Sequence, residues 1–180
     1  MSAYTLLIVG LLGVAAPSLA AEREPLQVYK DAAAEVRRYP LFTIYDSVQV
    51  QLGDGVVTLT GKVTQPFKRN AIAKRVAAVE GVSRVVNRIE VLPVSRFDDA
   101  LRLQVARAIY RNPTFATYGS MVNPPIHVIV ERGRVTLEGV VRTEGDRLLA
   151  HSLAGFVTAF SITNALQTEA EARNALESVS

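Results

Sequence analysis

The segment from Gly55 to Val63 reads GVVTLTGKV, and the segment from Gly133 to Val141 reads GRVTLEGVV. The two segments carry the same residue at six of nine positions, at a constant offset of 78 residues. A repeat of this kind indicates a tandem of one small module rather than a single larger domain. In each copy, apolar residues alternate with Thr or a charged residue, which is typical of a strand with one buried face.

The residues around the first copy predict the other elements of the module. Val28, Ala32 and Val36 recur at helical spacing, and Pro40 ends this helix because its ring blocks a further turn. Before the repeated strand, Val and Leu alternate with Gln, and a Gly-Asp-Gly turn joins the two strands. In order, the predicted elements are a helix over 28–36, strands over 48–52 and 57–63, a helix over 67–79 and a strand over 85–91.

The second copy repeats this order of elements. They are a helix over 101–109, strands over 126–130 and 135–141, a helix over 149–156 and a strand over 162–166. Two features differ: the loop from Phe115 to Pro125 is about five residues longer, and Thr158 replaces Gly81. The sequence therefore predicts an α+β fold of two tandem α-β-β-α-β modules, each a three-stranded mixed sheet with two helices on one face. We expect the modules to span residues 25–92 and 98–168, followed by a frayed helix or tail over 169–180.

The N-terminus predicts export. Residues from Leu6 to Ala16 form an apolar run, and Ser18-Leu19-Ala20 is a small-x-small cleavage pattern directly before charged residues. The run is too short to span a bilayer comfortably. We therefore expect residues 1–20 to be a signal peptide and the mature protein to be periplasmic, although no Lys or Arg precedes the run. The alternatives are a retained N-terminal anchor and a misplaced start codon.

Taken together, the module pattern resembles the BON domain, which occurs in tandem in periplasmic proteins of the osmotically inducible, OsmY-like family. The resemblance covers nearly the whole chain after the expected signal peptide. In the first copy the matching residues are Val57, Leu59, Gly61, Val63, Gly81, Val82, Val85 and Asn87. In the second copy they are Val135, Leu137, Gly139, Val141, Ile162, Asn164 and Leu166. Thr158 departs from the pattern, because the family has glycine at the turn between helix and strand.

The resemblance implies non-catalytic binding of phospholipid or a membrane surface, in support of envelope integrity under osmotic stress. It carries over no catalytic residue. Glycines recur in both copies and are expected to be structural, because a missing Cβ lets a helix or strand come close. These structural glycines are Gly55, Gly61, Gly81, Gly133 and Gly139.

Basic residues gather in the first module, which carries a net charge of +4 from residue 21 to 97, against −1 for the rest of the chain. Lys68, Arg69, Lys74 and Arg75 cluster on its second predicted helix. Such a face suits anionic phospholipid, since a Lys or Arg near the surface contributes about 1 kcal/mol. A solvated helix face is the alternative interpretation. A similar patch would suit nucleic acid, but export argues against that partner.

Aromatic residues and arginines gather in the second module, on its first helix and its long loop. Phe115 and Tyr118, with Arg107 and Arg111, are candidates for peripheral lipid binding, because aromatic rings and Arg favour the bilayer interface. Tyr110 and Met121 lie in the same stretch. The alternative is that the aromatic rings anchor the loop on the core of their own module.

Catalysis and metal binding are not indicated. The chain has no Cys, and His127 and His151 are too far apart in sequence for a typical zinc site. The sequence contains neither a phosphate-binding glycine loop nor a G-x-S-x-G motif, so we expect no cofactor. A protein–protein adaptor that uses an open sheet edge in an envelope assembly remains the alternative to lipid binding.

Overall fold

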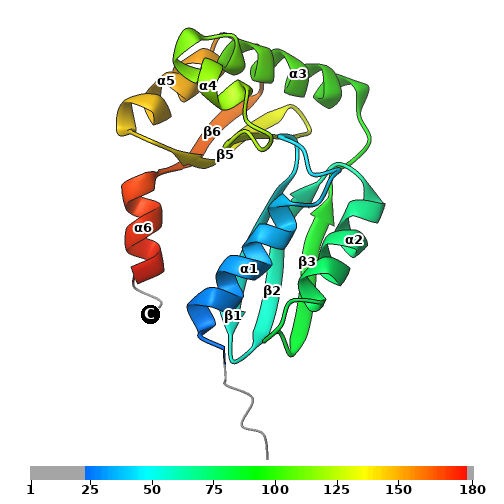
Figure 1. The fold of residues 1–180 in the computed structure, drawn as a ribbon. Helices are drawn as coiled ribbons and strands as arrows, with labels where there is room; N and C mark the ends of the chain where they lie inside the picture. The colour runs from blue at the N-terminus through cyan, green and yellow to red at the C-terminus, as the bar shows by residue number, and fades with distance from the viewer. Residues whose placement is uncertain (1–22, 178–180) are drawn as a thin grey trace, which may run out of the picture.

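The computed structural model describes residues 23–177, which form two three-stranded sheets, each with its helices on one face (Figure 1). The expected signal peptide, residues 1–20, lies outside the described residues. The predicted α+β fold of two tandem modules is confirmed.

The first module has the predicted order of elements. It consists of α1 (Pro25–Arg37), β1 (Ser47–Gly53), β2 (Val56–Val63), α2 (Pro66–Ala77) and β3 (Arg84–Val91). Strand β2 lies in the centre, antiparallel to β1 and parallel to β3. A parallel pair needs a long crossover, and α2 supplies it on the same face as α1. The sheet is therefore mixed, as predicted.

The second module repeats this topology. Its elements are α3 (Arg96–Tyr110), β4 (Ile126–Glu131), β5 (Arg134–Val141), α5 (Glu144–Ala154) and β6 (Ser161–Thr168). The long loop folds into a 3₁₀ turn, η1 (Pro113–Phe115), and a short helix, α4 (Ala116–Gly119). Residues of the expected tail form a further helix, α6 (Glu169–Glu177), which Thr168 and Glu171 cap by reciprocal side chain to backbone hydrogen bonds.

Each module has a core of its own, built from the predicted helical and strand faces. In α1 the buried residues are Val28, Ala32 and Val36, and in α3 they include Leu101, Val105 and Ile109. Full burial of one such Val, Leu or Ile stabilises the fold by roughly 1.5–3 kcal/mol.

The helix expected over 149–156 is shorter at its C-terminal end, which changes the surroundings of Phe156. Phe156 is 83% exposed, because α5 ends at Ala154 and the ring lies in the connection to β6. Ala150 and Ala154 form the buried face instead, and Leu149 and Leu153 pack half-buried beside it.

The repeated glycines Gly61 and Gly139 stand where neighbouring strands come very close. Their φ angles are +113° and +118°. A Cβ at Gly61 would lie 2.2 Å from the carbonyl oxygen of Ser47, and one at Gly139 would lie 1.9 Å from that of Pro125. Both positions therefore require glycine for sterics as well as for backbone conformation. The other expected structural glycines, Gly55, Gly81 and Gly133, also have positive φ.

The segment between α1 and β1, residues 38–46, packs against the second module and is called the inter-module segment below. The Val128 amide donates to the Ile44 carbonyl oxygen at 2.7 Å, so this segment covers part of the free edge of β4. Ile44 and Tyr45 pack against the core of the second module, and the Phe42 ring lies 5.5 Å from the His127 ring. The second module thus sits across one end of the first sheet (Figure 1).

Two polar contacts add to this junction. The Ser47 hydroxyl donates to the Glu138 carboxylate at 2.5 Å, and the Lys62 ammonium pairs with the Glu131 carboxylate. Each contact joins the first sheet to the outer face of the second sheet, the face without helices.

Candidate functional site

The basic cluster expected on α2 does not form a continuous surface. Lys68 is buried, because it lies one turn before Ile72 and Val76 on the inward face of α2. Its ammonium group lies 2.6 Å from the Asp46 carboxylate. The prediction of Lys68 as a lipid contact is therefore wrong.

The other three cations of the cluster differ in their surroundings. Arg75 is half-buried and pairs with Glu35 at 2.7 Å. Arg69 and Lys74 are exposed, and neither forms an ion pair within residues 23–177. Two cations of the predicted four thus remain available at this surface.

Asp46 is the centre of the network that holds Lys68. Its carboxylate also accepts hydrogen bonds from the amides of Thr64 at 2.7 Å and Thr43 at 2.9 Å. Burial by itself would raise the pKa of Asp46, but the hydrogen bonds from Lys68, Thr64 and Thr43 outweigh burial and lower it. This network fixes the inter-module segment to the start of α2.

Phe115 and Tyr118 lie inside the second module and not at its surface. Both side chains are buried, with ring centroids 5.7 Å apart, because η1 and α4 turn them inward. The Tyr118 hydroxyl accepts a hydrogen bond from the Arg142 amide at 3.0 Å. The prediction that these rings contact lipid is therefore wrong, and they anchor the loop as the alternative interpretation held.

Tyr110 is also structural. Its hydroxyl donates to the Ile126 carbonyl oxygen at 2.6 Å and accepts from the Ile126 amide at 3.2 Å, which fixes the start of β4. Burial raises the pKa of Tyr110 above its usual value, so the hydroxyl stays protonated. Met121, farther along the loop, is exposed.

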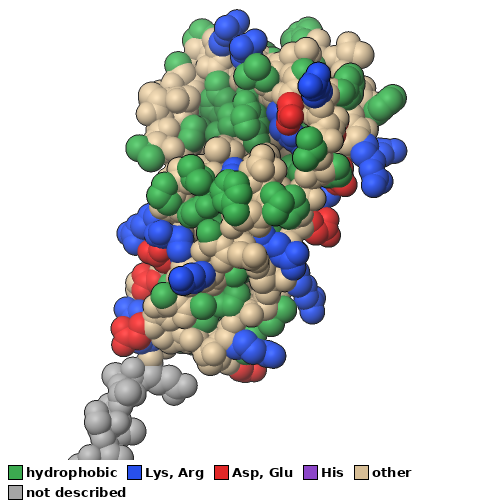
Figure 2. Space-filling model, turned by 90° about the vertical axis from the view of Figure 1, so that its right-hand side faces the viewer, with side chains coloured by type: hydrophobic (Ala, Val, Ile, Leu, Met, Phe, Trp, Pro, Cys, Tyr) green, Lys and Arg blue, Asp and Glu red, His purple; other side chains and the backbone are tan. Residues whose placement is uncertain are grey.

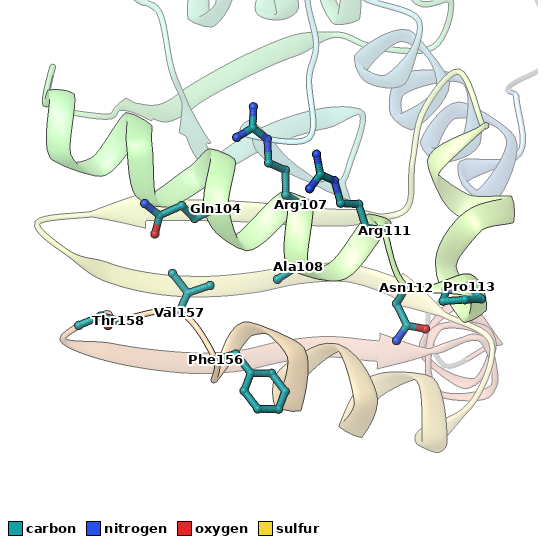
Figure 3. Close-up of a pocket in the computed structure, with 9 residues that line it drawn as sticks. All are labelled: Gln104, Arg107, Ala108, Arg111, Asn112, Pro113, Phe156, Val157 and Thr158. Atoms are coloured by element: carbon teal, nitrogen blue, oxygen red, sulfur yellow. The ribbon is translucent and has the colours of Figure 1, made fainter.

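Arg107 and Arg111 form the part of the predicted surface that the structure brings together. Arg107 lies on α3 and Arg111 follows its last residue, one turn later, and both line an open surface cleft of about 750 Å³ that Phe156 also lines (Figure 3). Their guanidinium groups extend in the same direction from the helix, away from the Phe156 ring (Figure 3). Among the described residues, no carboxylate lies within 4.0 Å of either group.

Three exposed phenylalanines of the second module were missed as surface residues. Phe97, Phe156 and Phe160 are 59%, 83% and 82% exposed. A Cβ on Gly133 would lie 2.4 Å from the Phe160 ring and 3.3 Å from the Phe97 ring, so these two rings flank the same turn. Figure 2 shows hydrophobic side chains gathered on the second module and in a band at the module junction, with Lys and Arg around them.

Comparison of the two copies in the sequence could have indicated that two of these rings are exposed. Phe97 and Phe160 stand where the first module has Glu24 and Ser83. The amides of Phe160 and Ser83 both donate to the glycine carbonyl of the preceding hairpin turn, which confirms that the two positions correspond. A polar residue in one copy and phenylalanine in the other indicates a surface specific to the second module.

Comparison with protein families identifies the module. The family model of the BON domain matches residues 32–93 and 98–170, which is well over half of the chain. The chain belongs to the BON-domain family. The predicted resemblance is thereby confirmed, including the two tandem copies.

Solved structures give weaker similarities to this BON-domain chain. CdsD, a structural protein of the type III secretion system of Chlamydia trachomatis, is 13% identical, with 84% of this chain and 97% of that chain covered and a TM-score of 0.29. The C-terminal domain of CdsD is also 13% identical, with 77% and 96% covered and a TM-score of 0.27. Among curated proteins, no match was found.

BON-domain proteins are generally non-catalytic, and the chemistry of this chain offers binding surfaces. In the stretch from residue 23 to 177, no three His, Asp or Glu side chains are grouped so that they could hold a metal ion. None of the helices in that stretch is long and apolar enough to cross a bilayer. The cleft beside α3, with two arginines and an exposed aromatic ring, is the candidate site of this BON-domain protein.

Proposed function

We propose that this BON-domain protein binds anionic phospholipid at a membrane surface of the periplasm through its second module, and thereby supports envelope integrity under osmotic or other stress. The observation that carries the proposal is a cleft lined by Arg107 and Arg111, which have no carboxylate partner within residues 23–177, and by the exposed Phe156. The periplasmic location rests on the sequence of residues 1–20, and fractionation of cells that express the full chain tests it.

The chemistry of the cleft suits a bilayer interface. A guanidinium group binds phosphate oxygens through two parallel hydrogen bonds, and an exposed aromatic ring gains from burial at the headgroup level. Each Arg near an anionic surface contributes about 1 kcal/mol. Arg107 and Arg111 together therefore account for about 2 kcal/mol, or about a thirtyfold change in affinity. Phe97 and Phe160 are further exposed aromatic rings on the same module.

Flotation of the mature chain with vesicles of phosphatidylglycerol and phosphatidylcholine tests the proposal. The variant Arg107→Gln/Arg111→Gln is expected to bind about thirtyfold more weakly, because both phosphate contacts are lost. Binding of the wild type is expected to weaken as salt is added, since salt screens surface charges.

Arg84→Gln/Arg88→Gln is the matched control, because it removes the same charge from exposed positions of β3, far from the cleft in sequence. Equal loss of binding in the two variants would show that net charge alone matters and would contradict the assignment of the cleft. Absence of vesicle binding, together with capture of one stoichiometric envelope protein, would favour the adaptor function instead.

A further inference from the structure

A second cavity lies at the junction of the modules, on the outer face of the second sheet, and has a volume of about 320 Å³. Lys62 of the first module and residues of the second module line it, and it shares no lining residue with the cleft beside α3. The lining residues are Lys62, Ile129, Glu131, Arg132, Arg134, Thr136 and Glu138. A volume of this size is at the lower end of those that hold small ligands.

Ion pairing across the junction leaves two cations of this cavity free. Arg134 stands opposite Glu131 in the register of β4 and β5, which is the expected cross-strand pair. Glu131 pairs instead with Lys62 of the first module. In the part of the chain that the structure describes, neither Arg132 nor Arg134 has a carboxylate within 4.0 Å of its guanidinium group.

The remaining carboxylate of the cavity lies at its other end. Glu138 follows Arg134 by four residues on β5, a distance of about 13 Å along a strand. Its carboxylate accepts a hydrogen bond from the Ser47 hydroxyl. The cavity therefore has a cationic end at Arg132 and Arg134 and an acidic end at Glu138, with Ile129 and Thr136 between them.

The backbone at the cationic end is held in place by a buried carboxylate. Asp98, at the start of α3, accepts hydrogen bonds from the amides of Arg132 at 2.9 Å and Gly133 at 2.8 Å. Asp98 is only 2% exposed, so the turn that carries the two arginines is fixed to the helix layer. A fixed turn reduces the entropy that a ligand must overcome to order its site.

We propose that this cavity binds a phosphate-type oxyanion between Arg132 and Arg134. Two guanidinium groups without carboxylate partners match phosphate oxygens through parallel hydrogen bonds, and the Thr136 hydroxyl is a further donor along the wall. The first module has Asp54 and Val56 at the corresponding positions, so the site is specific to the second module. The proposal does not depend on lipid binding at the cleft beside α3.

Titration of the mature chain with inorganic phosphate, followed through backbone amide NMR shifts, tests this site. Saturable shifts are expected at residues 131–136. Arg132→Gln/Arg134→Gln is expected to weaken phosphate binding at least tenfold, whereas Arg84→Gln/Arg88→Gln is expected to change it less than twofold. Phosphate shifts that are not saturable, or that survive in the Arg132→Gln/Arg134→Gln variant, would overturn the proposal.

Vesicles identify the source of the oxyanion. If the variant Arg132→Gln/Arg134→Gln loses phosphate binding and also binds phosphatidylglycerol vesicles at least tenfold more weakly, the oxyanion is a lipid headgroup. If vesicle binding is unchanged, the ligand is a soluble phosphate compound. The variant Arg107→Gln/Arg111→Gln is expected to retain phosphate binding at residues 131–136 whether or not the cleft beside α3 binds lipid, so the two proposals fail independently.

Discussion

Replacement of Gly139 by alanine is expected to destabilise the second module by at least about 3 kcal/mol. The new Cβ would lie 1.9 Å from the carbonyl oxygen of Pro125, which belongs to the backbone and has no rotamer to adopt. The φ angle of +118° adds strain, because a residue with a Cβ rarely adopts it. The strands β4 and β5 would have to separate at this point, which weakens the sheet at the start of β4.

Urea unfolding of Gly139→Ala, followed by circular dichroism, measures this loss of free energy. Gly53→Ala is the matched control, because nothing lies within 4 Å of a Cβ there and its φ is not positive. The control is expected to be neutral or more stable by up to about 1 kcal/mol. Gly61→Ala is expected to behave like Gly139→Ala in the first module. Equal unfolding free energies for Gly139→Ala and Gly53→Ala would contradict the close approach of the strands.

The architecture was predictable from the sequence because two signals agreed. Helical spacing at Val28, Ala32 and Val36 and strand alternation around each copy of the repeat both depend on local geometry, which the sequence carries directly. The role of Gly61 and Gly139 followed from their recurrence on a strand, where a missing Cβ has few other uses. The structure added the partner of each close contact, a carbonyl oxygen at the start of the neighbouring strand or directly before it.

The burial of the aromatic residues before β1 and β4 was harder to predict, because the same sequence pattern has different surroundings in the two modules. Phe42 and Tyr45 follow an Arg-x-Pro segment at the same spacing as Phe115 and Tyr118. In the second module about five further residues precede β4, and both rings turn into the core of their own module. In the first module the connection is shorter, and Tyr45 packs against the core of the second module. Whether such a ring packs in the core of its own module or of the other module therefore depends on tertiary contacts.

Lys68 shows the same limit for charged residues. Its spacing to Ile72 placed it on the inward face of α2, and this was the one local signal that it is buried. The partner that makes burial possible, Asp46, lies 22 residues earlier in a segment without regular structure. A buried Lys needs a partner charge, and the sequence does not show which carboxylate reaches it.

Replacement of Asp46 by alanine is expected to destabilise the first module strongly. In Asp46→Ala, the Lys68 ammonium remains almost fully buried without a counter-charge, and the Thr64 amide loses its acceptor. Loss of one member of a buried pair typically destabilises a protein by about 3–5 kcal/mol. Arg38→Ala, which breaks an ion pair whose Arg is 70% exposed, is the control and is expected to change stability by less than about 1 kcal/mol.

The double variant Asp46→Ala/Lys68→Met separates two contributions to the loss of stability: the unpaired charge of Lys68 and the lost hydrogen bonds of Asp46. It is expected to recover much of the loss, because no buried charge is left without a partner. The pKa of Asp46 is lower in the folded chain than its unfolded value of 3.8, so its stabilisation is present above that pH and is lost as pH falls through the folded-state pKa. Thermal unfolding from pH 7 to pH 2 should therefore show a steeper acid loss in the wild type than in the double variant. Parallel pH profiles, or an Asp46→Ala variant as stable as Arg38→Ala, would contradict the role of this pair.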